Sequence, residues 1–164
     1  MFTQVGLRMN CASCAAGLGG VVRELATREI LAQILVVNAL HSGTPEKRAV
    51  TNVVLMGCGE PLDNYDNTVR FLRNVSKERG IGISPRNISL STCGIVPKMY
   101  ALADEGIPVN LTVSLHNADD AERARIMPAA KAYKIADILK ACDYYFAKTG
   151  RRDIFEYSLI HGEN

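Results

Sequence analysis

Short apolar runs alternate along this chain with segments in which apolar residues recur at helical spacing. Residues 53–56 are a continuous apolar run, which is typical of a strand covered on both faces. Residues 109–115 alternate apolar and polar side chains, as a strand does. Further strands are expected at residues 2–6, 87–92 and 154–160. Because strands that alternate with helices pair in parallel through right-handed crossovers, the pattern predicts an α/β fold.

The segments between these strands carry helix signals. Thr27 is a suitable N-cap, and apolar residues recur at helical spacing over 30–35 and again over 69–75. Pro97 fits the first turn of a third helix. The strongest helical stripe runs over residues 135–146 and includes Cys142, which is therefore expected to be structural. Residues 41–50 are expected to form a polar loop.

The length of the chain limits how much of a barrel it can form. A complete (β/α)8 barrel takes about 250 residues, whereas this chain has 164. We therefore expect a single domain, an open, partial TIM-like barrel with about five parallel strands in sequential order. The predicted edge of the sheet carries both the cysteine loop and Glu60.

Composition excludes some classes of protein. The chain is 48% apolar and 22% charged, as in soluble globular domains, and no apolar run approaches the roughly 20 residues of a membrane span. The first residues do not resemble a signal peptide. Together with five cysteines, this predicts a cytoplasmic protein with free or metal-bound thiols and no membrane partner. A net charge of +2 does not by itself indicate nucleic-acid binding, and the sequence does not set the oligomeric state.

A C-x2-C pair, Cys11 and Cys14, lies in a glycine-rich segment, residues 7–20, which we call the cysteine loop. Such a pair is compatible with half a zinc site, a dithiol redox pair or part of an iron–sulfur site. A zinc site would need a histidine such as His41 or His161, and these two have no paired spacing. Leu7 stands where C-x3-C-x2-C would place a third thiolate.

Polar and small residues follow each predicted strand. Carboxyl ends of parallel strands meet at one edge of a sheet, so we expect these residues to lie close together. Taken singly, Ser91 and Ser114 would serve as helix caps and His116 as a structural histidine. Taken together, Gly59 lets backbone approach a ligand, Glu60 accepts from an ammonium group, and the serines bond hydroxyls or carboxylates.

Several ordered motifs then carry a family resemblance. They are residues 8–14 (RMNCASC), 18–20 (LGG), 56–64 (MGCGEPLDN), 90–97 (LSTCGIVP), 114–116 (SLH) and 127–128 (MP). The chain resembles the radical S-adenosylmethionine (SAM) adenine-C2 methyltransferases of ribosomal and transfer RNA, the RlmN family. Relatives of the Cfr type methylate C8 of the same ribosomal adenine, and the sequence Gly-Glu-Pro at 59–61 fits the C2 enzymes better.

The resemblance implies a [4Fe–4S] cluster held by three cysteines, SAM bound to it, and ribosomal and transfer RNA as partners. The cluster reduces SAM to a 5′-deoxyadenosyl radical, which takes hydrogen from a methyl group carried on a cysteine. By position, Cys11 and Cys14 would bind the cluster, and Gly59 and Glu60 the amino group of SAM. The rest of the SAM site would consist of Ser91, Ser114, Leu115 and His116. No residue is assigned a catalytic role.

The chain departs from the family pattern in ways that qualify this expectation. Leu7 replaces the first cluster cysteine and has no donor atom. Residues 1–164 are expected to be one radical SAM core domain, truncated at both ends relative to the family, without its accessory domain and its methyl-carrying cysteine. Cys58 and Cys93 follow predicted strand ends, and either could approach the cysteine loop. The alternative is an inactive fragment that retains weak SAM or metal binding.

Overall fold

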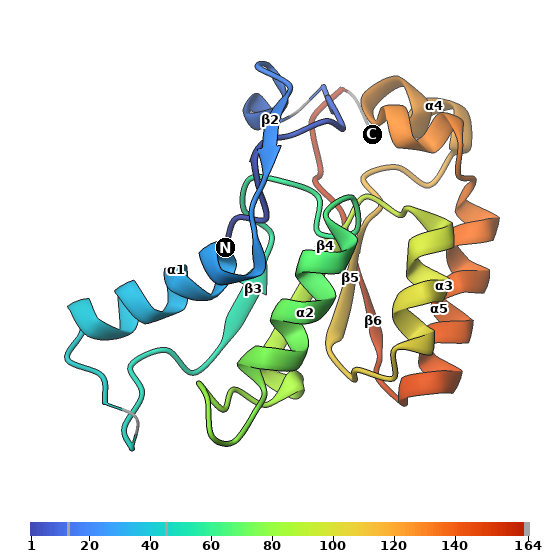
Figure 1. The fold of residues 1–164 in the computed structure, drawn as a ribbon. Coiled ribbons are helices and arrows are strands. Elements are labelled where there is room, and N and C mark those ends of the chain that lie inside the picture. Colours follow the sequence, from blue (N-terminus) through green and yellow to red (C-terminus); the bar gives the residue numbers. More distant parts are fainter. Residues whose placement is uncertain (13, 45, 163–164) are drawn as a thin grey trace.

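A parallel four-stranded sheet forms the centre of the computed structural model, which describes residues 1–12, 14–44 and 46–162. Its strands are β3 (Val53–Leu55), β4 (Ile88–Thr92), β5 (Asn110–Ser114) and β6 (Asp153–Glu156). They lie in the order β3-β4-β5-β6, and every neighbouring pair is parallel (Figure 1). The predicted α/β class, the sequential order and the open sheet are confirmed.

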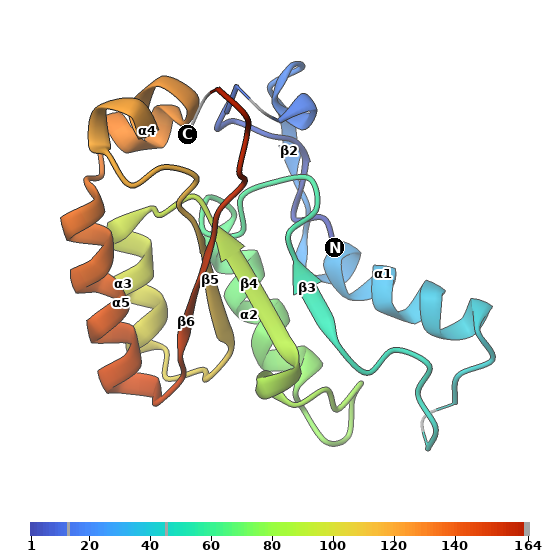
Figure 2. The same cartoon turned by 180° about the vertical axis from the view of Figure 1, so that it is seen from behind.

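Helices cover one face of this sheet. The α-helices are α1 (Thr27–Leu40), α2 (Tyr65–Val75), α3 (Val96–Asp104), α4 (Asp120–Ile126) and α5 (Ile135–Thr149). Seen from behind, β4 crosses in front of α2, while α3 and α5 stand beside β6 (Figure 2). The core between these layers includes Leu55, Phe71, Leu90, Leu111 and Ile138, all fully buried. Cys142 is buried in this core on α5, as its place on the helical stripe predicted.

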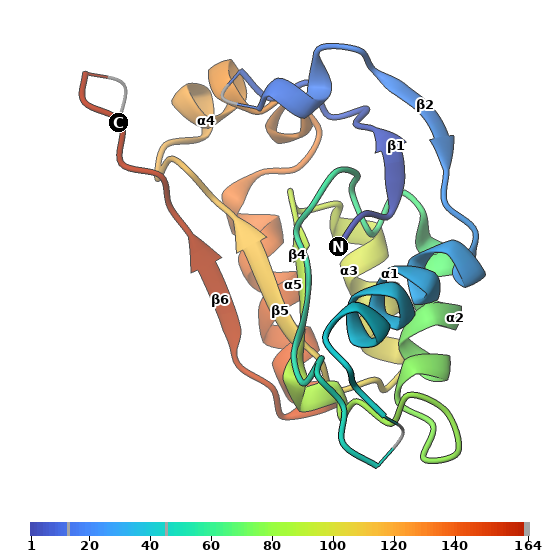
Figure 3. The ribbon, with the colours of Figure 1, turned by 90° about the vertical axis from the view of Figure 1, so that its left-hand side faces the viewer.

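The first predicted strand does not belong to the parallel sheet, and the expected count of five parallel strands is wrong. β1 (Gln4–Gly6) pairs antiparallel with β2 (Val21–Glu24) in a separate two-stranded sheet. An antiparallel pair needs only a loop between its strands, whereas a parallel pair needs a crossover. The cysteine loop is that connection, and the hairpin holds it above the carboxyl ends of the parallel strands (Figure 3).

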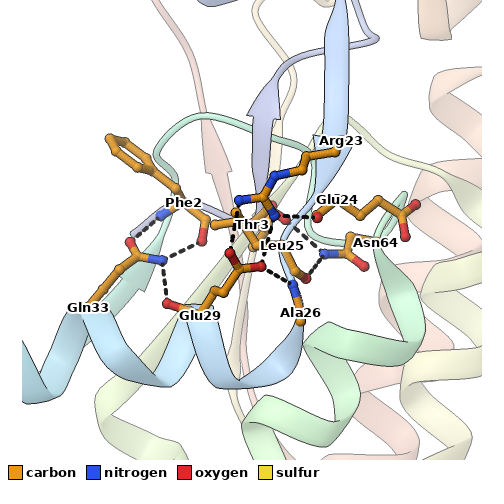
Figure 4. A network of polar contacts seen from close by, with 9 residues as sticks. All are labelled: Phe2, Thr3, Arg23, Glu24, Leu25, Ala26, Glu29, Gln33 and Asn64. Atoms are coloured by element: carbon orange, nitrogen blue, oxygen red, sulfur yellow. Dashed lines mark hydrogen bonds and ion pairs between the residues drawn. The ribbon is translucent and has the colours of Figure 1, made fainter.

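Side chains of two other elements clamp the hairpin at its base (Figure 4). The Asn64 amide donates to the backbone carbonyls of Thr3 and Leu25, at 2.7 and 2.8 Å. Gln33 on α1 accepts from the Phe2 backbone N–H and donates to the Phe2 carbonyl, each at 2.9 Å. The base of the hairpin is thus fixed to α1 and to the loop before α2.

The start of α1 differs from the prediction by one residue. The helix begins at Thr27, but its N-cap is Ala26, not Thr27. Glu29 accepts from the Ala26 backbone N–H at 2.9 Å and also pairs with Arg23 on β2 through two bonds of 2.8 Å (Figure 4). Glu29 therefore provides an acceptor for the backbone N–H at the N-cap of α1, and it also joins the helix to the hairpin.

Other element boundaries shift modestly. The last strand covers Asp153–Glu156, shorter than the predicted 154–160. Pro97 lies in the first turn of α3, as predicted. The short 3-10 helices are η1 (Ala15–Gly17), η2 (Pro85–Asn87) and η3 (Pro128–Lys131). Across the described ranges, no helix has the length and apolar character that a bilayer crossing requires.

Candidate functional site

A cavity opens at the carboxyl edge of the parallel sheet, beneath the cysteine loop. The loop contributes Leu7, Cys11 and Cys14, and the strand ends contribute Gly59, Glu60, Ser91, Cys93, Ser114 and His116. The expectation that the cysteine loop, Glu60 and the 114–116 segment share one edge is therefore confirmed. Of the predicted site residues, Leu115 is the one that does not line this cavity.

Glu60 is a buried carboxylate in the wall of the cavity. It is 4% exposed, and its two oxygens accept from the backbone N–H groups of Leu62 at 3.0 Å and Cys93 at 2.8 Å. Burial raises the pKa of this carboxyl, and the hydrogen bonds from Cys93 and Leu62 partly offset the rise. No ion pair to Glu60 occurs within the described ranges. A buried carboxylate without a cation, facing a cavity, suits a positively charged ligand group.

The turn that presents Glu60 requires glycine at the preceding position. Gly59 has a φ of +103°, and a Cβ there would lie 2.6 Å from the backbone nitrogen of Gln4. The Glu60 backbone N–H donates to Oε1 of Gln4 at 2.9 Å. β1 and the turn after β3 thus meet without space for a side chain between them.

The cysteine loop is held over the cavity by backbone bonds. The Leu7 N–H donates to the Gly20 carbonyl at 3.1 Å, and the Ala12 N–H donates to the Ile126 carbonyl at the end of α4 at 2.9 Å. Burial raises the pKa of the Cys11 thiol, and Cys14 and Glu60 raise it further. These effects favour the neutral thiol of Cys11.

The other cysteines that follow strands differ in position. Cys93 lines the cavity and is 7% exposed, and burial together with the neighbouring Glu60 strongly raises its pKa. Cys58 does not line the cavity, and its backbone carbonyl accepts from Thr3 N–H at 3.0 Å. Cys93, and not Cys58, is thus the cysteine that shares a cavity with Cys11 and Cys14.

The segment after β5 places a histidine in the cavity wall. His116 has a φ of +58°, which is uncommon outside glycine, and its Nδ1 accepts from the Ser158 N–H at 3.2 Å. Burial lowers the pKa of His116, and this favours the neutral imidazole. The following helix is capped by Asp119, which accepts from two backbone N–H groups, so Ser114 is not its cap. Likewise, α3 has Ile95 and not Ser91 at its N-cap position.

A buried arginine that sequence reasoning missed joins two of these strand ends. Arg123 on α4 is 0% exposed; its Nη2 donates to the carbonyls of Cys93 at 2.9 Å and Ser114 at 3.2 Å. Its Nε donates to the Leu115 carbonyl at 3.0 Å. Its Nη1 has no hydrogen-bond partner among the described residues. In sequence, Arg123 belongs to a charged run typical of a solvated helix face, which gives no sign of burial.

Comparison with known proteins decides the family. The radical SAM superfamily model matches residues 1–164. This chain belongs to the radical SAM superfamily. It is 54% identical over 162 residues to the "Probable dual-specificity RNA methyltransferase RlmN" of Lachnoclostridium phytofermentans, covering 99% of this chain and 44% of that protein. It is 52% identical over 161 residues to the protein of the same name from Clostridioides difficile, covering 98% and 46%.

A solved structure agrees. The fold is similar to that of a radical SAM methyltransferase from Sphaerobacter thermophilus, with a TM-score of 0.92 and 40% identity. That match covers 99% of this chain and 47% of the other. The chain thus spans less than half the length of the relatives it matches.

The superfamily uses SAM and a [4Fe–4S] cluster, and the residues of this cavity fit SAM better than they fit the cluster. The carboxylate of Glu60, which has backbone N–H partners but no ion pair among the described residues, fits the ammonium group of SAM. The cysteine loop carries two thiols, and Leu7 adds no donor. Within the part of the chain that the structure describes, no three His, Cys, Asp or Glu residues are grouped to hold a metal ion. The loop thus offers two thiols where a [4Fe–4S] site uses three, and Cys93 is a further thiol in the wall of the same cavity.

Proposed function

We propose that residues 1–164 form the single radical SAM core domain of an RNA methyltransferase of the RlmN type, with SAM in the cavity at the sheet edge. The observation that carries this proposal is Glu60: a buried carboxylate in the cavity wall, held by backbone N–H groups and without an ion pair in the described part of the chain. The family match and the names of the relatives support the same assignment.

Each side of the cavity has a part in this proposal. Glu60 accepts hydrogen bonds from the SAM ammonium group. Gly59 packs the turn closely against Gln4 and presents its backbone in the cavity wall to the methionine portion. The remaining contacts come from Ser91, Ser114 and His116, which line the cavity. Leu115 does not line it, and its backbone carbonyl and N–H are bonded to Arg123 and Glu156, so it supports the site by its position between Ser114 and His116. When bound, SAM supplies the methyl group and the adenosyl portion that this superfamily uses.

The substrate proposal rests on the relatives. They are named dual-specificity RNA methyltransferases, and we extend this to ribosomal and transfer RNA as substrates, with adenine C2 as the methylated position. A cytoplasmic location follows from that role.

Ligand binding tests the proposal directly. Isothermal titration calorimetry with SAM should give saturable binding, and 5′-methylthioadenosine, which lacks the amino-acid portion, should bind at least about tenfold more weakly, a difference of about 1.4 kcal/mol. Absence of SAM binding at millimolar concentration would overturn the proposal.

A second candidate, an inactive fragment that retains weak SAM or metal binding, is favoured by one observation, Leu7 in the cavity wall. With two thiols, the parent chain is expected to retain well below one cluster per chain after anaerobic reconstitution, and Leu7→Cys to retain severalfold more. Iron and acid-labile sulfide per chain measure this. Leu18→Cys is the matched control, since it adds a thiol to the same loop at an exposed position. Equal, near-full occupancy in parent and Leu7→Cys would mean that another group, with Cys93 the nearest candidate, completes the site.

A further inference from the structure

Gln4 is a buried glutamine whose two polar atoms are both committed. The residue is 1% exposed; its Oε1 accepts from the Glu60 backbone N–H at 2.9 Å, and its Nε2 donates to Oδ2 of Asp63 at 2.8 Å. It therefore joins the start and the end of the turn that presents Glu60.

The two hydrogen bonds of Gln4 are connected to the cysteine loop through Asp63. The Asp63 oxygen that accepts from Gln4 lies 3.2 Å from Nε of Arg8, which belongs to the loop. Arg8, Asp63, Gln4 and the Glu60 backbone form one connected chain of polar contacts. The two halves of the cavity, the thiol side and the carboxylate side, are linked through it.

The hydrogen bonds in this row of polar contacts require an amide side chain at position 4. A backbone N–H can only donate and a carboxylate can only accept, so the side chain between them must offer one acceptor and one donor. Glutamine does so, whereas glutamate offers two acceptors, and methionine offers only a weak acceptor and no donor. The position is also tightly packed, because Gly59 lies directly against the Gln4 backbone.

We propose that Gln4 is a positioning residue for SAM binding: it fixes the Glu60 backbone so that the carboxylate faces the ligand ammonium, and Asp63 and Arg8 couple it to the cysteine loop. This inference rests on the proposed function, since it gives Glu60 the ammonium group of SAM as its partner. Gln4 itself does not line the cavity and acts through Glu60.

Gln4→Glu is the first test, because it preserves shape and removes the donor. At pH 8 the affinity for SAM should fall about tenfold or more, while that for 5′-methylthioadenosine, which lacks the ammonium group, should change less than about twofold. The charged groups around position 4 are Asp63, Glu60, Arg8 and, opposite on β2, Glu24. Because two adjacent carboxylates share a proton readily, the ratio of variant to parent affinity should recover towards pH 5.5.

A complementary pair gives a second test. In Gln4→Glu/Asp63→Asn, the amide introduced at position 63 donates to the carboxylate introduced at position 4, which still accepts from the Glu60 N–H. The double variant should bind SAM more tightly than Gln4→Glu but less tightly than the parent, because the amide nitrogen at position 63 replaces the oxygen that also pairs with Arg8. Gln33→Glu is the matched control: Gln33 bonds the Phe2 backbone on the same hairpin and has no contact with Glu60 in the described structure. Its SAM affinity should equal that of the parent.

The results distinguish failure of the positioning role from failure of the proposed function. Equal loss of both ligands in Gln4→Glu, or no loss of either, would overturn the positioning role. If circular dichroism shows that Gln4→Glu does not fold, Gln4→Met, which keeps length and adds no charge, decides by the same two-ligand comparison. A parent chain that does not bind SAM would overturn the proposed function and this inference with it, whereas a parent that binds SAM leaves the variants to decide the inference alone.

Discussion

At the scale of single residues, two buried groups of opposite charge lie at the same sheet edge without forming an ion pair in the described structure. Glu60 is held by backbone N–H groups, and Arg123 by backbone carbonyls. Each charge is therefore partly compensated by peptide dipoles and keeps capacity for a further partner. Glu60 lines the cavity and Arg123 does not, so their predicted effects differ.

Glu60→Gln is expected to weaken SAM binding about tenfold or more, near 1.4 kcal/mol, because the amide nitrogen would face a backbone N–H of Leu62 or Cys93. In the parent, the raised pKa of Glu60 means that acidification protonates it earlier than an exposed glutamate of pKa about 4.3. SAM affinity should therefore fall on acidification before that value is reached. Calorimetry from pH 5 to 8 measures both the effect of the variant and the pH dependence of SAM affinity, and Glu24→Gln is the exposed control. An unchanged SAM affinity in Glu60→Gln would contradict the proposal that Glu60 binds the ammonium group.

Arg123→Met should lower the free energy of unfolding by about 3 kcal/mol, because three backbone carbonyls, one buried and two half-buried, lose their donor. Arg123→Lys keeps the charge but offers fewer donors in a different geometry, so its loss should be intermediate. Arg125→Ala on the same helix is the control: its side chain is 68% exposed, and its pair with Glu122 contributes little. Urea denaturation measures all three. Equal losses at positions 123 and 125 would show that burial of the guanidinium has no energetic consequence.

The sequence predicts only part of this site. Residues directly after strands, such as Glu60 and Ser114, are predictable because the carboxyl ends of parallel strands must meet. Gln4 and Arg123 are not, because a side chain that bonds a distant backbone group has no local signature in sequence.

At the scale of elements, periodicity predicts the buried strands and the longer helices, since each must present an apolar face to a common core. The β1–β2 hairpin breaks this rule. β2 is largely exposed and carries no apolar alternation, so the pairing that removes β1 from the parallel sheet leaves no trace in the pattern. The charged α4 is missed for the same reason: it buries Arg123 rather than an apolar stripe.

The junction of α5 and β6 gives a prediction at this scale. Asp153 begins β6, its Oδ1 is buried without a partner among the described residues, and burial raises its pKa to about 6. Folding therefore favours the protonated form. The stability gained by binding this proton in the folded state is fully present below the unfolded pKa near 3.9. It is lost as the pH rises towards the folded pKa of about 6. Asp153→Asn should thus match the parent near pH 4 and exceed it above pH 6.

We expect a gain on the order of 1 kcal/mol at pH 7, reduced from the full value because the carboxyl is partly open to solvent. Urea unfolding at pH 4, 5, 6 and 7 measures the difference. Asp137→Asn, at an exposed position on α5, controls for the loss of one negative charge. A gain that does not change with pH would show that Asp153 titrates normally.

At the scale of the whole molecule, the described parallel sheet has two edges, β3 and β6, and apolar side chains are exposed beside both. Near β3 they include Val54 and, on α1, Val36 and Leu40; near β6 they include Ile154 and Phe155. Unpaired strand edges and contiguous apolar surface favour association.

We therefore expect the isolated chain to self-associate at tens of micromolar, as sedimentation velocity over a concentration series would show. Val36 is 57% exposed and Leu40 is 76% exposed on the outer side of α1, so Val36→Lys/Leu40→Lys should raise the monomer fraction without loss of helix. Thr44→Lys/Thr51→Lys adds the same charge at exposed polar positions and separates removal of apolar surface from a rise in net charge. Equal effects of the two pairs would assign association to net charge, and a parent that stays monomeric at about 100 micromolar would contradict the prediction altogether.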